Sequence, residues 1–141
     1  MATQELTMDQ IQSRMGHVKL YAIFMRPTDK YDAETEEGKE LLRKHLQFQL
    51  DLWDRGILFA AGPLKYGPTD ESFYTYQQPD KPLIAANGMM MIAARSRQEA
   101  EEIAHTEPFY QVGWREQTIC QWNLNEGRSV ELAKEMLAAR K

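Results

Sequence analysis

The sequence predicts an α+β fold in which strands and helices follow one another as β-α-β-β-α-β, with one further helix at the end. Three observations support this fold class. Residues 17–25 are rich in Val, Tyr, Ile and Phe, as strands are. Residues 35–55 carry apolar side chains at helical spacing. Residues 88–94 are apolar on both faces of an extended chain, which is typical of a central strand.

The first strand presents two alternating sets of side chains, and both sets are apolar, so we expect it in the middle of a sheet. Arg26 and Pro27 end it, and the polar, acidic residues that follow predict a solvated connection. The helix over residues 35–55 comes next, and Gly56 is its expected C-terminal signal. Its apolar stripe includes Leu41, His45, Phe48 and Leu52. The short apolar run 57–61 predicts the second strand.

Helix signals also follow the third strand, residues 88–94. Ser96 and Glu99 form a capping-box pattern that starts the second helix, and Pro108 is expected to end it. Residues 114–123 predict the fourth strand, in which Thr118, Cys120 and Trp122 alternate with polar side chains.

Cys120 lies in the middle of this fourth strand, so we expect a packed small side chain rather than a nucleophile. Residues 127–141 predict the terminal helix, because Val130, Leu132, Ala133, Met136 and Leu137 give it apolar positions.

This order of elements is that of the ferredoxin-like arrangement, in which the first and third strands lie centrally in an antiparallel sheet. Two helices cover only one face of a four-stranded sheet. The other face of the central strands would therefore be a large exposed apolar patch. We expect a homodimer that packs sheet against sheet. The alternative is that the terminal helix covers this face within one chain.

The domain organisation is expected to be simple. Residues 1–16 are interpreted as an N-terminal arm, and residues 17–141 as a single domain. Within that domain, residues 65–87 form a long polar and aromatic hairpin insertion. Loops of this length without regular structure are uncommon in compact domains and often carry function.

Composition excludes several classes of protein. With 141 residues, 43% hydrophobic residues and a net charge of −4, the chain is expected to be globular and to bind no nucleic acid. The longest apolar run, residues 89–94, is too short to span a membrane. The first residues show no secretory signal, and Cys120 has no partner for an intrachain disulfide, which favours a reducing cytoplasmic location.

Three segments carry a resemblance to a known family. Residues 43–64 read RKHLQFQLDLWDRGILFAAGPL, with a helical histidine, a glycine, an apolar strand and Ala-Gly-Pro. Residues 96–114 read SRQEAEEIAHTEPFYQVGW, with a helix start and a Pro-aromatic turn that leads to Val-Gly. Together with the strand that ends at Trp122, their order and spacing resemble the YciI-like (YCII-related) domain family over residues 17–123. The resemblance implies ferredoxin-like subunits that pair into a dimeric α/β barrel.

The resemblance also implies an active-site pair, a histidine on the first helix and an aspartate in an Asp-Pro-aromatic turn. His45 matches the histidine position. Glu107, before Pro108 and Phe109, stands where the family has aspartate, and it keeps the carboxylate while adding a methylene. The long connection 65–87 is a second departure, because family members usually have a shorter one.

This pair suggests acid–base chemistry. A carboxylate on one imidazole nitrogen would fix the tautomer of His45 and leave the other nitrogen for substrate. We therefore expect His45 to act as general base or acid and Glu107 to orient it. The alternative is a core histidine bonded to backbone, with Glu107 as an exposed turn residue. Trp122, Phe109 and Tyr74 are expected to shape the substrate pocket.

No cofactor and no metal are expected. His105 and Glu107 could suggest a metal site with His45, but no ligand set with regular zinc spacing accompanies them. The sequence also has no phosphate-binding glycine motif. The predicted function is a cofactor-independent enzyme of lyase, isomerase or hydrolase type that acts on a small organic molecule, with aromatic compounds as candidates. The alternative is a non-catalytic small-ligand-binding or assembly module that uses residues 65–87.

Overall fold

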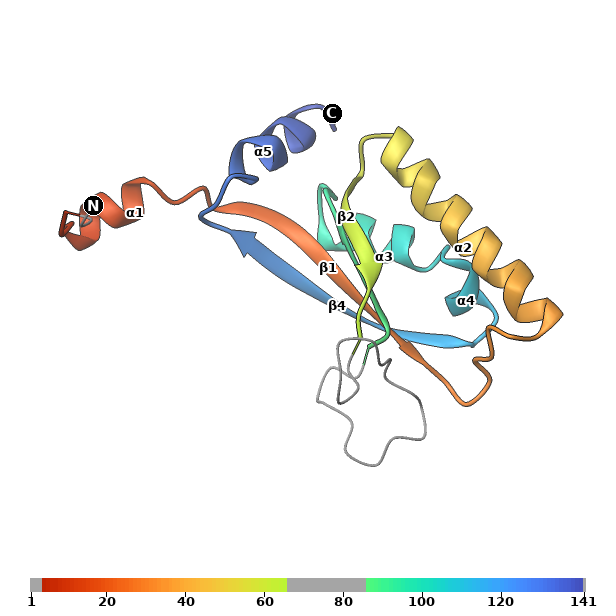
Figure 1. Ribbon diagram of the computed structural model, residues 1–141. Coiled ribbons are helices and arrows are strands. Elements are labelled where there is room, and N and C mark those ends of the chain that lie inside the picture. The colour runs from red at the N-terminus through yellow and green to blue at the C-terminus, as the bar shows by residue number, and fades with distance from the viewer. Residues whose placement is uncertain (1–3, 66–85, 141) are drawn as a thin grey trace.

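The computed structural model describes residues 4–65 and 86–140, and Figure 1 shows their arrangement around one sheet. Its elements are α1 (Met8–Ser13), β1 (Val18–Pro27), α2 (Glu36–Asp54), β2 (Leu58–Pro63), β3 (Gly88–Ile92), α3 (Arg97–Ala104), α4 (Pro108–Gln111), β4 (Arg115–Leu124) and α5 (Val130–Ala138). Within the described residues, four strands form an antiparallel sheet in the order β2-β3-β1-β4. The predicted α+β, ferredoxin-like fold is confirmed.

The strands that are apolar on both faces occupy the centre of the sheet. β1 pairs with β3 through Tyr21 opposite Ile92, and with β4 through Tyr21 opposite Gln121. β2 and β4 form the two edges. The central position of β1 and β3 follows from their composition, because each needs apolar neighbours on both faces.

The helix α2 has a defined signal at each end. At its start the hydroxyl of Thr35 accepts a hydrogen bond from the Gly38 amide at 3.0 Å. At its end Gly56 has a φ of +73°, a conformation that glycine adopts without steric cost. A β-carbon on Gly38 would lie 1.9 Å from the carbonyl oxygen of Asp32. The connection from β1 therefore packs directly against the first turn of α2.

The second half of the chain follows its sequence signals with two differences. Ser96 caps α3 by accepting a hydrogen bond from the Glu99 amide at 3.1 Å. The Glu99 carboxylate accepts from the amide of Arg95 instead of completing the capping box on Ser96. Pro108, expected to end a helix, begins the short helix α4 with Glu107 as its N-cap. The fixed φ of proline and its missing amide hydrogen suit the first helical position.

Each face of the sheet carries its own apolar cluster. The cluster under α2 and α3 contains Tyr21, Ile23, Met25, Leu52, Ile57, Met90, Ile92, Ala94, Ala100 and Ala104. The cluster on the opposite face contains Val18, Leu20, Ala93, Leu124, Val130 and Ala133. Its last two members belong to α5, which lies beside the start of β1 (Figure 1). The terminal helix therefore covers one end of this face within the chain.

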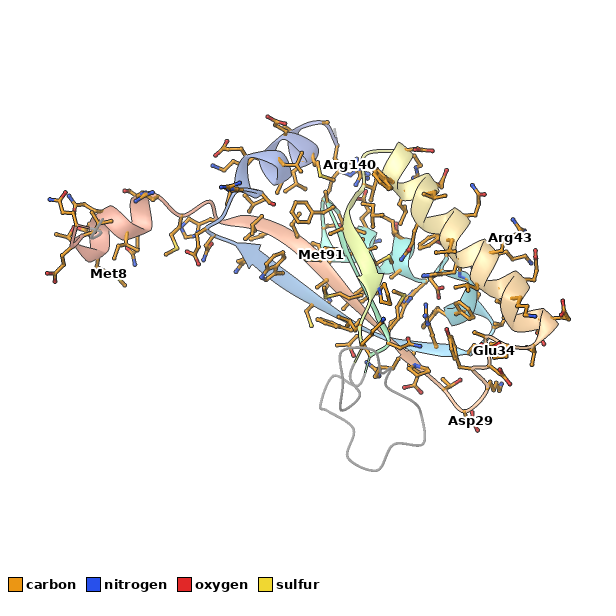
Figure 2. The ribbon with its side chains drawn as sticks, viewed as in Figure 1. Met8, Asp29, Glu34, Arg43, Met91 and Arg140 are labelled. Carbon is orange, nitrogen blue, oxygen red and sulfur yellow. The ribbon has the colours of Figure 1, made fainter. Side chains whose placement is uncertain are left out.

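The described residues leave the rest of this face open. Phe24 and the labelled Met91 (Figure 2) are half-buried there, and Trp122 is 40% exposed. Cys120 is exposed on the same side of β4. The expectation that Cys120 packs inside the protomer is wrong, because this side of β4 faces away from α2 and α3.

Two segments stand apart from the sheet core. α1 projects from the N-terminal end of β1 (Figure 1), and none of its residues is buried. Pro63 pairs with Gly88, so the predicted insertion 65–87 connects two neighbouring antiparallel strands. Most of that insertion lies outside the described residues. No helix in the described part of the chain is long and apolar enough to cross a membrane.

Candidate active site

His45 and Glu107 come together from two elements on the same side of the sheet. His45 projects from the middle of α2, and Glu107 is the N-cap of α4. The Nδ1 atom of His45 lies 2.7 Å from Oε1 of Glu107, across a sequence separation of 62 residues. The two side chains are 7% and 0% exposed. The structure thus places the predicted pair in direct hydrogen-bond contact inside the protein.

Further partners hold the Glu107 carboxylate. Its Oε2 accepts a hydrogen bond from the Tyr110 amide at 2.7 Å, which is the bond that starts α4. The Nη1 atom of the buried Arg115 lies 4.0 Å from Oε1. A buried carboxylate without partners would be very costly. The three contacts explain how Glu107 remains fully inside the protein.

These contacts also determine the protonation state of Glu107. Burial by itself would raise its pKa, but the hydrogen bond and charge of His45, the Tyr110 amide and the charge of Arg115 outweigh burial. Together they hold the pKa of Glu107 below its usual value. Glu107 is therefore a carboxylate at neutral pH. Because a carboxylate can only accept, the neutral imidazole of His45 carries its proton on Nδ1 and has Nε2 as acceptor.

Aromatic rings surround the pair. The ring centroid of Phe109 lies 5.7 Å from that of His45, and the guanidinium carbon of Arg115 lies 4.6 Å from the same Phe109 centroid. Tyr31, from the β1–α2 connection, packs on Phe109 at 5.1 Å. These rings keep water away from the charged groups, and such an environment strengthens their interactions.

A cavity of about 530 Å³ opens beside His45, at the ends of the strands that α2 covers. Its polar lining residues are Thr28, Tyr31, Glu34, His45, Gln49, Asn87 and Arg115. Nε2 of His45 has no hydrogen-bond partner among the residues that the structure describes. The volume suits a small organic ligand. A ligand in this cavity would therefore face an imidazole nitrogen that can accept a proton.

The residues predicted to shape the pocket have different positions. Phe109 is fully buried behind the pair, so it supports His45 and Arg115 and does not line the cavity. Trp122 pairs with Leu20 and lies on the opposite face of the sheet, away from His45. That position corrects the expectation for Trp122 within one protomer. Tyr74 lies outside the described residues.

His105 does not join the pair. It caps the C-terminal end of α3, and its ring stacks on Tyr110 at 4.9 Å between centroids. Among residues 4–65 and 86–140, no three His, Cys, Asp or Glu side chains are grouped as a metal site would require.

Sequence reasoning missed three residues of the site, Arg115, Asn87 and Tyr31. No sequence signal marked Arg115, because its side of β4 also carries the polar Gln117 and Gln121. Asn87 and Tyr31 lie in connections between elements. Side chains there do not alternate at a fixed period, so their direction could not be predicted from the sequence.

The fold and the site together define a class: small ferredoxin-like α+β proteins with a buried histidine–carboxylate pair at a cavity wall. Within it, this chain belongs to the YCII-related domain family, whose model matches residues 20–123. The family resemblance seen in the sequence is thereby confirmed. No curated protein matches the chain.

The chain is similar in fold to a solved enzyme structure. That structure is the 5-chloro-2-hydroxyhydroquinone dehydrochlorinase of Burkholderia phenoliruptrix AC1100, in complex with 2,5-dihydroxybenzoquinone. The TM-score is 0.50, and the match covers 74% of this chain and 93% of that chain at 15% sequence identity. At this level of identity the likeness establishes the shared fold.

Proposed function

We propose that this protein is a small cofactor-independent enzyme that uses His45 and Glu107 for proton transfer on a small organic substrate. The observation that carries the proposal is the 2.7 Å contact between Nδ1 and Oε1 at the wall of a cavity. A histidine that only fills the core needs neither an ionised partner nor a cavity beside its second nitrogen.

The chemistry follows from the tautomer. With its proton on Nδ1, His45 accepts a substrate proton on Nε2, and the Glu107 carboxylate stabilises the imidazolium that forms. The ring then returns that proton to another atom of the substrate or to a leaving group. Protons and charge balance in this cycle, so an isomerase or lyase reaction needs no oxidant or second reactant. A hydrolase reaction would add water.

Aromatic and quinone-like compounds are our candidate substrates. The cavity volume fits a single substituted ring. The structurally similar enzyme acts on a hydroxyhydroquinone, as its name states, and binds a dihydroxybenzoquinone. This support is an analogy between folds, to which the His45–Glu107 pair adds the chemistry.

We propose a homodimer as the working form, with the open part of the sheet as its interface. We also propose that residues 17–141 act as a single domain, that residues 1–16 are an arm, and that the protein works in the cytoplasm. The exposed, apolar side chains on the open face support the dimer. The exposed free thiol of Cys120 suits a reducing compartment.

Turnover of a defined compound set tests the function. The protein is incubated in D₂O with chlorinated and unchlorinated hydroxyhydroquinones, and conversion or deuterium uptake at ring carbons is followed by NMR. We expect wild-type protein to act on at least one compound, and His45→Gln to lower that rate by about 10²–10⁴-fold. The control is Arg43→Gln, on the solvent side of the same helix (Figure 2) and paired with Glu40. It should keep the wild-type rate, whereas full activity in His45→Gln would exclude the proposed chemistry.

A further inference from the structure

Two buried polar atoms in the cavity region have no hydrogen-bond partner among the described residues. They are Nε of Arg115 and Oδ1 of Asn87. Arg115 is 6% exposed and Asn87 is 8% exposed, and both line the cavity beside His45. Buried polar atoms without a hydrogen-bond partner are rare and unfavourable. An unpaired donor and an unpaired acceptor at one cavity therefore suggest a ligand that would bond to both.

Arg115 is held firmly, but no carboxylate of the described residues lies within hydrogen-bond distance of it. Its guanidinium carbon lies 4.6 Å from the Phe109 centroid and 5.3 Å from that of Tyr31, whose side chain also forms a hydrogen bond with it. Its Nη1 donates to the thioether sulfur of Met25 at 3.7 Å, a weak acceptor. The Glu107 oxygen near it is 4.0 Å away and already bound by His45. The guanidinium has five donors, so it retains capacity for a strong acceptor.

The backbone fixes the position of Asn87. Its amide donates to the carbonyl of Met25 at 2.9 Å, and its carbonyl accepts from the amide of Leu64 at 3.1 Å. These bonds anchor Asn87 at the start of β3, directly before Gly88. The backbone of Asn87 is therefore bonded on both sides, to Met25 of β1 and to Leu64 directly after β2.

The charges of the site favour an anion. With His45 neutral, the charges of Glu107 and Arg115 cancel, and a proton on His45 leaves the three residues with a net positive charge. Glu34 also lines the cavity, but it is exposed to solvent. A negative charge on the substrate would be favourable beside a desolvated guanidinium, both before and after proton transfer.

We infer that Arg115 and Asn87 form a subsite for a planar organic anion with neighbouring oxygen groups, such as a phenolate, an enolate or a carboxylate with an adjacent hydroxyl. The charged oxygen contacts the guanidinium of Arg115, and the hydroxyl donates to Oδ1 of Asn87. This inference rests on the proposed function and names the substrate class of the same site. Arg115 then stabilises the charge that stays on the substrate when His45 removes a proton.

Calorimetric titration of the full chain with three pairs of compounds tests the subsite. The anions are 4-nitrophenolate, benzoate and ionised 2,5-dihydroxybenzoquinone at pH 8. Their neutral counterparts are 4-nitroanisole, methyl benzoate and 2,5-dimethoxybenzoquinone. We expect at least one anion to bind tenfold or more tightly than its counterpart. Equal affinities within all three pairs would overturn the inference.

Asn87→Asp is the decisive variant because it keeps the size of the side chain. The new carboxylate places a negative charge on the wall of the cavity that Arg115 also lines, so anion affinity should fall at least tenfold while the neutral counterparts bind as before. An Asn87 with only a structural role would lose stability and leave the preference for anions intact. Arg115→Gln should also weaken anion binding, but it removes a partner of Glu107 and can impair folding. Unchanged anion affinity in Asn87→Asp would overturn the inference.

His45→Gln separates this inference from the proposed function. The variant should retain anion binding and lose turnover. If anions bind but His45→Gln keeps its turnover, the acid–base function fails and the subsite stands. If His45→Gln loses turnover but Asn87→Asp binds anions as wild type does, the subsite alone fails.

Discussion

Among single residues, Glu107 connects the fold with the candidate chemistry. One of its carboxylate oxygens starts α4 through the Tyr110 amide, and the other binds Nδ1 of His45. The same side chain therefore sets the position of a helix and the tautomer of the imidazole. A change at Glu107 should affect both stability and proton transfer.

Replacing Glu107 with Gln should destabilise the protein in a pH-dependent way. The pKa of Glu107 is lower in the folded protein than the value of about 4.3 expected in the unfolded chain. Its ionised form therefore stabilises the fold above about pH 5, and this contribution is lost as the pH falls through the folded pKa. We expect a deficit in the free energy of unfolding of about 1–3 kcal/mol at neutral pH.

Urea unfolding of wild type and Glu107→Gln over a range of pH measures this deficit. It should stay constant from about pH 6 to 8 and shrink below about pH 4.5. Glu40→Gln is the matched control, because Glu40 is exposed and pairs with Arg43 on the surface, so its replacement should change stability little. A deficit that grows toward acid pH would contradict the assignment of Glu107 as the ionised partner.

Residue types at the site were predictable to different degrees. His45 stood out because it interrupts an apolar stripe, and the family resemblance supplied Glu107 as its partner. Arg115 was missed because arginine is almost never fully buried without partners, so an exposed position was the simpler interpretation. The burial of Arg115 depends on Phe109 and Tyr31, whose contacts with it arise only in the folded chain.

At the scale of elements, the β1–α2 connection forms one wall of the cavity. Thr28, Tyr31 and Glu34 line the cavity from this connection, and Figure 2 shows Asp29 and Glu34 within it. Its position depends on Gly38, because only a glycine lets the carbonyl of Asp32 approach the first turn of α2 so closely. The shape of the cavity thus depends on a residue outside it.

Gly38→Ala should therefore destabilise the protein, although alanine is normally the better helix residue by about 1 kcal/mol. The new β-carbon would meet the carbonyl oxygen of Asp32 at 1.9 Å, and the connection would have to move. We expect a loss of about 1–3 kcal/mol in the free energy of unfolding.

Gly62→Ala is the matched control, because a β-carbon there meets nothing within 4 Å. Thermal and urea unfolding of both variants provide the comparison. Equal stability of Gly38→Ala and wild type would show that the connection is not held against α2 as described.

Long periodic elements were predictable, and the shortest helix was not. α2 lies within the predicted residues 35–55 because its apolar stripe and Gly56 agree, and the Thr35 cap found in the structure sets its start. α4 is a single turn, too short for any periodicity, and its stability comes from the Glu107 cap and the burial of Phe109. The fold was therefore predictable from local patterns, whereas the turn that carries Glu107 required tertiary contacts.

For the whole molecule, the open part of the sheet is the main apolar surface that the described residues leave uncovered. α5 covers Val18 and Leu20 at one end, so the chain supplies part of the cover that the sequence assigned to a second subunit. Trp122, Cys120 and the half-buried Met91 lie on the remainder. A second copy of this chain would bury them, and the proposed dimer follows from that need.

Trp122→Glu should convert the proposed dimer to a monomer, because it places a charge on the apolar face proposed as the interface. Trp53→Glu is the matched control, since Trp53 is 67% exposed on α2, away from the open face. Sedimentation velocity gives the oligomeric state of both variants. A wild-type monomer, or a dimer that survives Trp122→Glu and dissociates in Trp53→Glu, would contradict the proposed interface.

The most direct test of the account is the protonation pattern of the His45 ring. Long-range ¹H–¹⁵N NMR spectra at neutral to mildly alkaline pH distinguish the two nitrogens of each imidazole, and His45→Gln assigns the signals. When the ring is neutral, we expect its proton on Nδ1 and an unprotonated Nε2, because Glu107 lies 2.7 Å from Nδ1 as a carboxylate. A neutral ring with its proton on Nε2 would contradict the account, because the nitrogen that faces the cavity could then accept no proton.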